Sequence, residues 1–398
     1  MVSCNFSQND NYPFEIQSWL SSRKIAAFSL FASRFIYAAN WFNLSPAVNN
    51  IGAWYGIPVS TVGLVFTFFL VGAGIFQIPA GMIASRIGPK RTSVIGLAIM
   101  SITSFLALFA PDFLVLILYR TVSGIGAAFF FSSALAVLSD LYPENITSMT
   151  WLNNACFNLG GGFGIVLMTW VTGGYGWISN SLLMGLLTVP FVFLMLTTVP
   201  ASEQFARIDL PRVRAKMLDR GTWLLAIGFS GFWASGYEFP EFLKSYAETI
   251  GATPSLAGAV GSLALFSGLG GIVLTSWIKK KDPIVSSILM SVVAGIGIML
   301  LPLLGIAGIT VVAIAEGILF GLVSALEYVL VIKSEPERIY RPLRLGLFNS
   351  IQILFGSILS LFFTFLLSYG YTASWVFLGF CVIILLPAVL VERGEFRP

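Results

Sequence analysis

Three of the 22 Lys and Arg residues lie within or at the end of long apolar stretches, namely Arg34, Arg120 and Lys244. A charge at the centre of a membrane span costs about 2.5 to 3.5 kcal/mol on insertion scales, and it persists where it faces a bundle interior, water or a partner. A guanidinium group presents a planar fork that binds carboxylate or phosphate. We therefore expect Arg34 and Arg120 to bind an anionic solute. Lys244 is expected to extend its amine toward the outer surface.

Neutral polar side chains accompany these arginines. Tyr37 and Trp41 follow Arg34 on the same helical face, three and seven residues later. Elsewhere two Asn residues stand one helical turn apart, which places them on a shared face. The neutral contacts of the predicted solute site are Tyr37, Asn40, Asn154 and Asn158.

Acidic residues within apolar stretches are candidates for proton coupling. The chain has no His, so Asp, Glu, Lys, Tyr or water must carry protons. Glu238 and Glu241 share a helical face, and Glu316 occupies a comparable depth in a later stretch. A carboxyl group that alternates between a buried and a hydrated environment can load and release a proton. The alternative is that Arg120 with Glu316, and Arg34 with Glu238, form fixed ion pairs.

Metal, cofactor and catalytic chemistry find no support in the sequence. The three Cys residues have spacings that fit neither a disulfide framework nor a zinc site, and His is absent. No nucleophile is accompanied by a positioned base. No nucleic-acid motif appears either. We therefore expect no cofactor, no metal, no nucleic-acid partner and no enzymatic activity.

The elements that must position these residues are membrane-spanning helices. Hydrophobic residues make up 57% of the 398 residues and charged residues only 10%. A span needs about 20 mainly apolar residues, so the chain is expected to be an all-α integral membrane protein with twelve spans. They lie near 25–49, 59–84, 92–110, 113–139, 147–172, 177–199, 222–247, 255–278, 284–303, 308–333, 343–368 and 372–391.

The remaining basic residues indicate the topology. They lie in gaps between alternate spans, and retained loops are rich in Lys and Arg. This pattern places both termini in the cytoplasm of a multi-pass cell-membrane protein, with loops that suit anionic lipids. The clusters are Arg23/Lys24, Arg86/Lys90/Arg91, Arg207/Arg212/Arg214/Lys216/Arg220, Lys279/Lys280/Lys281, Lys333/Arg338/Arg341/Arg344 and Arg393/Arg397.

The spans divide into two similar halves. GIPVSTVG at 56–63 is echoed by GATPSLAG at 251–258, and each precedes a Gly-rich span. A parallel repeat of two six-helix bundles is a recurrent transporter plan. The predicted domains are a tail at 1–24, a bundle at 25–199, a linker at 200–221, a second bundle at 222–391 and a tail at 392–398.

Two motifs resemble the major facilitator superfamily. GMIASRIGPKR at 81–91 matches that family's cytoplasmic loop pattern, although Ser85 stands where the family has an acid. YRTVSGIGAA places Gly124 and Gly126 four and six residues after Arg120, as in the family's fourth span. The resemblance implies two pseudo-symmetric six-helix bundles. It implies gating roles at Gly81, Arg86, Gly88, Lys90 and Arg91, and we add Asp140 at the end of the fourth span.

The function these features favour is secondary active transport. We expect a monomeric, proton-coupled symporter that moves a small anionic solute by alternating access, with protons and membrane lipids as its other partners. Proton-driven efflux of amphipathic or cationic compounds is the alternative within transport. A non-transporting receptor or scaffold is the alternative of another class, but the chain offers neither a partner-binding domain nor a long tail.

Overall fold

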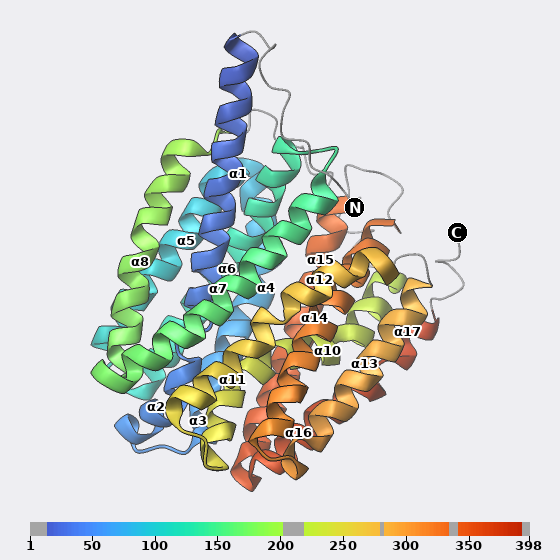
Figure 1. Cartoon of the computed structure of the whole chain (residues 1–398). Coiled ribbons are helices and arrows are strands. Elements are labelled where there is room, and N and C mark those ends of the chain that lie inside the picture. The colour runs from blue at the N-terminus through green and yellow to red at the C-terminus, as the bar shows by residue number, and fades with distance from the viewer. Residues whose placement is uncertain (1–13, 202–218, 279–281, 334–340, 392–398) are drawn as a thin grey trace.

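The computed structural model describes residues 14–201, 219–278, 282–333 and 341–391. Within these ranges the secondary structure is entirely helical. The predicted linker at 200–221 and both predicted tails lie largely outside the described residues. Figure 1 shows long helices running between two opposite faces, and we call the face beyond which α1 projects the upper face and the opposite one the lower face.

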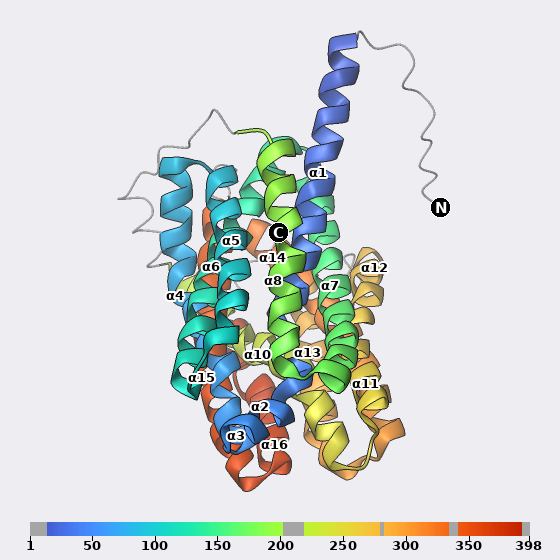
Figure 2. The same cartoon turned by 90° about the vertical axis from the view of Figure 1, so that its left-hand side faces the viewer.

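The first group of helices, α1 to α8, covers residues 14–198. α1 starts before the span expected at 25, projects beyond its neighbours (Figure 2), and ends at Trp41 ahead of a short 3-10 turn that contains Pro46. The bounds are α1 (Phe14–Trp41), η1 (Ser45–Ala47), α2 (Val48–Tyr55), α3 (Val59–Val62), α4 (Leu64–Ile87), α5 (Pro89–Leu106), η2 (Ala107–Phe109), α6 (Phe113–Leu141), α7 (Ile146–Tyr175) and α8 (Trp177–Thr198).

The second group, α10 to α17, covers residues 220–391 except for those that are not described. One expected span, 255–278, is divided at Ser267 into α11 and α12. The bounds are α10 (Arg220–Thr249), α11 (Pro254–Phe266), α12 (Gly268–Ile278), α13 (Pro283–Leu300), η3 (Leu301–Leu303), α14 (Ile306–Lys333), α15 (Arg341–Leu366), η5 (Leu367–Tyr369), α16 (Tyr371–Ile384) and α17 (Pro387–Val391).

Ten helical segments of the described chain are long and apolar enough to cross a membrane. α1 and α10 are not among them, although they contain 28 and 30 residues. α1 carries Arg34, and α10 carries Glu238, Glu241 and Lys244, and these side chains lower the hydropathy of their helices. α1 and α10, which are too polar to count among these ten segments, therefore contain most of the charged residues that the sequence analysis selected within apolar stretches.

Glycines with a positive φ occur at corresponding turns of the two groups. Gly56 (φ 66°) follows α2, and Gly251 (φ 96°) lies between α10 and α11. Gly176 (φ 79°) and Gly370 (φ 104°) each precede an aromatic residue that begins the last long helix of a group. Residues with a Cβ atom disfavour such backbone angles. Glycines with a positive φ thus recur at a spacing along the chain that is close to the spacing of the sequence repeat.

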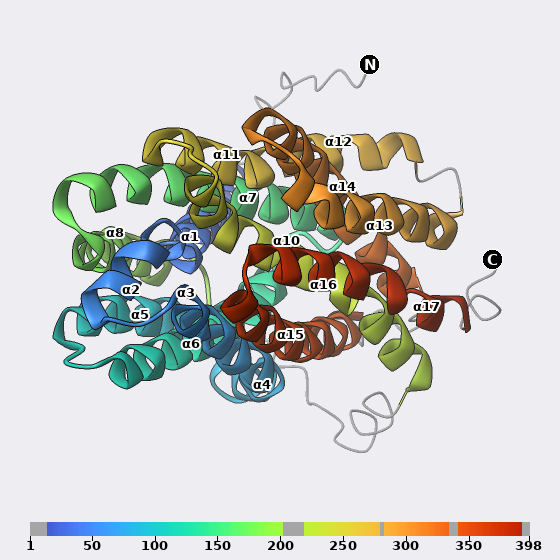
Figure 3. The ribbon, with the colours of Figure 1, turned by 90° about the horizontal axis from the view of Figure 1, so that it is seen from below.

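The two groups of helices meet along two long seams. α4 packs on α15, and α7 packs on α11. Figure 3 shows both seams from below, with α15 beside α4 and α11 near α7. Ser350 in α15 donates a hydrogen bond to the Gly74 carbonyl oxygen of α4 at 3.0 Å. The seams leave the centre of the molecule lined by helices of both groups.

At the lower face, polar contacts join the two groups. Ser45 Oγ donates to the carbonyl oxygens of Pro240 and Glu241 at 2.9 and 3.0 Å. Asn49 Nδ2 donates to Glu248 at 2.7 Å. Further hydrogen bonds link Ser245 with Asn49 (2.8 Å) and Thr67 with Ser360 (2.7 Å). We call this set the lower-face contacts, and they close the space between the groups on this side.

Candidate functional site

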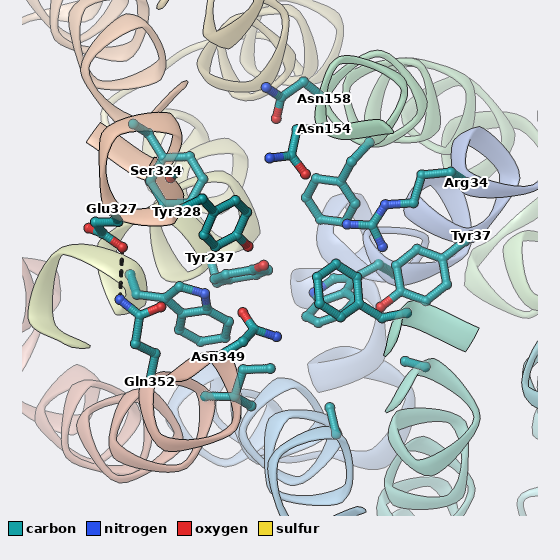
Figure 4. Close-up of a pocket in the computed structure, with 18 of the residues that line it drawn as sticks. Arg34, Tyr37, Asn154, Asn158, Tyr237, Ser324, Glu327, Tyr328, Asn349 and Gln352 are labelled. Carbon is teal, nitrogen blue, oxygen red and sulfur yellow. Dashed lines mark hydrogen bonds between the residues drawn. The ribbon is translucent and has the colours of Figure 1, made fainter. Parts of the chain in front are cut away.

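A central cavity lies between the two groups of helices. It encloses about 720 Å³, including the part that is open to solvent. Figure 4 shows polar side chains converging on it from both groups. The lining includes Arg34, Tyr37 and Trp41 of α1, Gln77 of α4, Phe131 of α6, Asn154, Phe157 and Asn158 of α7, Trp233 and Tyr237 of α10, Phe320, Ser324, Glu327 and Tyr328 of α14, and Asn349 and Gln352 of α15.

Arg34 is the buried cation of this cavity. Its side chain is held among three rings, with the guanidinium carbon 4.6 Å from the centre of Tyr37, 4.8 Å from Phe131 and 4.5 Å from Phe157. Arg34 is 4% exposed, and its Nε and Nη1 atoms have no hydrogen-bond partner. It forms no ion pair within the described part of the chain. Aromatic faces stabilise the cation, but they leave its hydrogen-bonding capacity free.

Neutral donors stand near Arg34 on the same side of the cavity. Asn154 and Asn158 project from α7 one turn apart, as the spacing predicted, and both line the cavity (Figure 4). Gln77 of α4 was not anticipated. It is 3% exposed and its Nε2 atom has no partner. Sequence reasoning passed over Gln77 because an uncharged Gln in an apolar stretch gives a weaker signal than an Arg.

The opposite side of the cavity belongs to the second group. Gln352 Nε2 donates a hydrogen bond to Glu327 Oε2 at 2.9 Å, as the dashed line in Figure 4 marks. Glu327 lies near the end of its predicted span, where a role as a gate or helix cap is the simplest expectation. The structure instead places it in the cavity wall, because the cavity reaches past the middle of α14. The rule that selected Arg34, a charge within an apolar stretch, would have selected Glu327 too.

Aromatic rings of both groups meet on the lower side of the cavity. The rings of Trp41 and Tyr237 lie 5.0 Å apart, and Trp233 lies 3.9 Å from Tyr237. Trp41 is the last residue of α1, so this cluster lies between the cavity and the lower-face contacts. Together the rings and the hydrogen bonds beneath them separate the cavity from the lower face.

Two residues that we expected at the solute site lie outside the cavity lining. Asn40 donates to Ser104 at 3.1 Å and to Thr188 at 3.5 Å, so its amide joins α1 to α5 and α8. Arg120 donates to the Trp41 carbonyl oxygen at 3.0 Å and to Asn43 Oδ1 at 3.3 Å. Asn40 faces the interior of the first group, whereas the Arg120 guanidinium contacts the lower end of α1 and lies near the interface with α10, outside the cavity wall.

The candidate coupling acids are buried below the cavity. Neither oxygen of Glu238 has a hydrogen-bond partner, and Glu316 accepts a hydrogen bond from Ser235 at 2.9 Å. Glu241 lies across the interface from Arg120. The ion pairs considered as an alternative, Arg120 with Glu316 and Arg34 with Glu238, do not form among the described residues.

Lys244 does not extend to the surface as predicted. Its side chain is buried, and its amine forms an ion pair with Glu248 one turn later, at 2.6 Å. Glu248 also accepts the hydrogen bond from Asn49 across the interface. The prediction was wrong because it considered the lysine without the carboxylate four residues further along the same helix.

The motif residues assigned to gating lie at the upper ends of α4 to α6. Gly88 has φ 96° and joins α4 to α5. Lys90 Nζ donates to the Leu196 carbonyl oxygen at the end of α8, at 2.8 Å. Arg86, Arg91 and Asp140 are at least partly exposed, and space is open beside Gly81. Among the described residues, no group of three or more His, Cys, Asp or Glu could hold a metal ion.

Many apolar helices around a central polar cavity are typical of a multi-pass membrane protein. Residues 30–340 match the model of the Major Facilitator Superfamily. The chain belongs to this superfamily, which confirms the resemblance read from its two motifs.

Individual relatives are more distant. The chain is 27% identical over 201 residues to a gallate transporter of Pseudomonas putida, covering 48% of this chain and 44% of the relative. It is 23% identical over 266 residues to the 4-hydroxybenzoate transporter PcaK of Pseudomonas aeruginosa, covering 57% and 59%. These matches therefore span about half the length of either relative. A solved point mutant of the nucleoside transporter NupG shares the fold with a TM-score of 0.75 at 15% identity, covering 92% of this chain and 100% of that one.

Proposed function

We propose that this protein is a secondary active transporter of small organic anions, with carboxylates on an aromatic ring as its solute class. Arg34 binds the carboxylate, while Tyr37, Asn154 and Asn158 contact the rest of the solute. Two curated relatives carry the names of transporters for gallate and 4-hydroxybenzoate, both of which are aromatic carboxylates. The rings of Phe157, Tyr237 and Tyr328 supply flat apolar surfaces that suit such a solute.

The observation that carries this proposal is the unpaired guanidinium group of Arg34. Burying one partner of an ion pair without the other is strongly unfavourable, and intramembrane charges are by default functional. Arg34 has two nitrogens without partners on the wall of a cavity between the two helical groups. A bound carboxylate would neutralise the charge and accept charge-assisted hydrogen bonds from the guanidinium group.

The proposal includes the topology that the basic clusters favour. Twelve spans, two six-helix halves and cytoplasmic termini place the upper face in the cytoplasm. The conformation described here would then be closed toward the outside by its lower-face contacts. Alternating access would break these contacts and close the cavity at the upper face, where Gly81, Arg86, Gly88, Lys90, Arg91 and Asp140 lie.

Proton coupling is the last part of the proposal, with Glu238, Glu241 and Glu316 as the acids. All three are at most 3% exposed, and none forms an ion pair with a cation of the described chain. Glu238 and Glu241 also lie on α10, which carries several of the lower-face contacts. Opening of the lower face would hydrate these carboxyl groups and allow them to exchange protons with the outer solution.

The test is uptake into proteoliposomes that contain the full-length protein, over a panel of aromatic carboxylates, their neutral amides and organic cations. We expect carboxylates to be transported and amides to be ignored. Arg34→Ala removes at least one charge-assisted hydrogen bond, worth about 1.5 to 3 kcal/mol, so it should raise the apparent KM for carboxylates at least about 10- to 100-fold. Lys24→Ala, which removes an exposed positive charge outside the cavity, is the matched control.

The panel also separates the competing functions. Uptake of carboxylates that is equal in wild type and Arg34→Ala would refute the proposed site. Transport of cations in place of carboxylates would favour efflux of cationic compounds. A receptor or scaffold would move none of the compounds.

A further inference from the structure

The cavity wall opposite Arg34 contains hydrogen-bonding atoms that the protein leaves unpaired. Glu327 is 3% exposed and Gln352 is fully buried, yet both line the cavity. They bind one another through a single hydrogen bond, from Gln352 Nε2 to Glu327 Oε2. Glu327 Oε1 and Gln352 Oε1 have no partner. Buried polar atoms are normally satisfied, so these two oxygens are available to a ligand.

The unpaired atoms on the two walls differ in kind. On the side of the first group they are donors, namely Nε and Nη1 of Arg34 and Nε2 of Gln77. On the side of the second group they are the acceptors of Glu327 and Gln352. A carboxylate only accepts hydrogen bonds, so the Gln352 amide nitrogen faces Glu327 and the amide oxygen stays free. The cavity therefore offers donors at one end and acceptors at the other.

A solute that satisfies both walls needs an acceptor group at one end and a donor group at the other. We propose that Glu327 and Gln352 form a second subsite, which binds a hydroxyl group at the end of the solute remote from its carboxylate. This inference rests on the proposed function, in which Arg34 binds the carboxylate. It narrows the solute class to hydroxylated aromatic carboxylates.

The expected selectivity follows from the cost of leaving these acceptors unpaired. A site built to hydrogen-bond a hydroxyl group rejects an analogue that lacks the proton. A methoxy group keeps the oxygen but removes the donor. Between Arg34 and the subsite the cavity is lined by Tyr237 and Tyr328, as Figure 4 shows, so a flat ring can join the two ends of the solute.

The experiment measures binding of benzoate, 4-hydroxybenzoate and 4-methoxybenzoate to the purified full-length protein by titration calorimetry. In wild type we expect 4-hydroxybenzoate to bind at least about 10-fold more tightly than 4-methoxybenzoate. Glu327→Gln, which replaces a charged acceptor by a neutral one, and Gln352→Leu, which removes an acceptor, should each lower this ratio at least about threefold and leave the affinity for benzoate within about twofold. Thr310→Ala, which changes a residue of α14 outside the cavity lining, should preserve the ratio.

Failure of this inference can be told apart from failure of the proposed function. If Arg34→Ala binds benzoate as well as wild type does, the anion site itself is refuted. If benzoate binding depends on Arg34 but the hydroxy-to-methoxy ratio is unaffected by Glu327→Gln and Gln352→Leu, only the second subsite is overturned. If Glu327→Gln leaves the ratio unchanged and abolishes accumulation driven by a pH gradient, Glu327 serves proton coupling, which also overturns the subsite.

Discussion

Arg34 and Arg120 show how two buried arginines of one chain acquire different surroundings. The Arg34 guanidinium lies against the rings of Tyr37, Phe131 and Phe157, and its Nε and Nη1 atoms have no hydrogen-bond partner. Arg120 donates to Trp41 and Asn43 and thereby holds the lower end of α1. The first arrangement suits a ligand, whereas the second stabilises the helix that carries Trp41.

The sequence could indicate that these side chains are buried, but not which of them reaches the cavity. Burial follows from a charge within an apolar stretch. Exposure to the cavity depends on how each helix is rotated against its neighbours, and that rotation is fixed by contacts between distant residues. Arg34, Tyr37, Asn154 and Asn158 line the cavity as the helical spacing suggested, whereas Asn40 contacts Ser104 and Thr188 instead.

Glu238 provides the residue-scale test of proton coupling. Glu238→Gln keeps the shape of the side chain and removes the exchangeable proton. We expect uptake driven by a pH gradient to fall at least about tenfold while exchange of solute for solute continues, because exchange needs no net proton movement. Parallel measurements of gradient-driven uptake and exchange in proteoliposomes check this prediction.

Asp112→Asn is the matched control for Glu238→Gln, because Asp112 is an exposed acid and Asn also caps helices well. It should behave like wild type in both measurements. Gradient-driven accumulation by Glu238→Gln at the wild-type level would exclude Glu238 as the coupling acid.

At the scale of helices, close crossings occur where one helix presents glycine to its neighbour. A Cβ atom on Gly160 would lie 2.0 Å from the Phe35 carbonyl oxygen of α1, and one on Gly72 would lie 2.2 Å from the Thr121 carbonyl oxygen of α6. In the second group, a Cβ atom on Gly271 would lie 2.0 Å from the Ile318 carbonyl oxygen. Gly270 is not such a crossing, because the atom nearest to an added Cβ there would be 3.7 Å away.

Gly160 and Gly173 form a matched pair within α7. Gly160→Ala would place a methyl group against the backbone of α1, whereas Gly173 has no atom within 4 Å of the added Cβ. We expect Gly160→Ala to destabilise the protein by about 1 to 3 kcal/mol, a typical cost of overpacking. Thermal unfolding in detergent should show a Tm lowered by several degrees for Gly160→Ala and little changed for Gly173→Ala. Equal Tm values would contradict the close crossing of α1 and α7.

The positions of the long helices could be predicted well, whereas their ends and breaks could not. Apolar length and basic loops decide where a span lies, and both are local properties of the sequence. These local properties did not predict three features of the helices: the start of α1 at Phe14, the separation of α3 from α4 at Gly63 and the division at Ser267. The break at Gly63 depends on packing, because a Cβ atom there would collide with Thr364 and Phe242 of the second group.

At the scale of the whole molecule, the two groups of helices touch at the lower face and along the seams. Thr67 and Ser360 lie on α4 and α15, and their hydroxyl oxygens are 2.7 Å apart. Any motion that opens the lower face must separate these helices there. A covalent link between these positions therefore tests whether the protein works by such a motion.

Cysteines at both positions, in a background where the three native Cys residues are replaced by Ser, should form a disulfide on oxidation. We expect transport to fall to background when the disulfide forms and to return on reduction. The matched control pairs cysteines at Ser29 and Thr198, whose hydroxyl oxygens are also 2.7 Å apart but lie within the first group. That link should leave transport intact. Full activity of a completely cross-linked Thr67→Cys/Ser360→Cys protein would contradict alternating access through the lower face.

The lower-face contacts also affect the free energy of the opposite conformation, in which the lower face is open. Ser45, Asn49, Ser245 and Thr67 contribute about four hydrogen bonds between the groups, each worth about 1 kcal/mol net. Without compensation, their loss would leave the opposite conformation populated at about one part in a thousand. A protein that cycles readily must therefore form contacts of comparable strength at the upper face, so that bound solute and protons tip an almost balanced equilibrium.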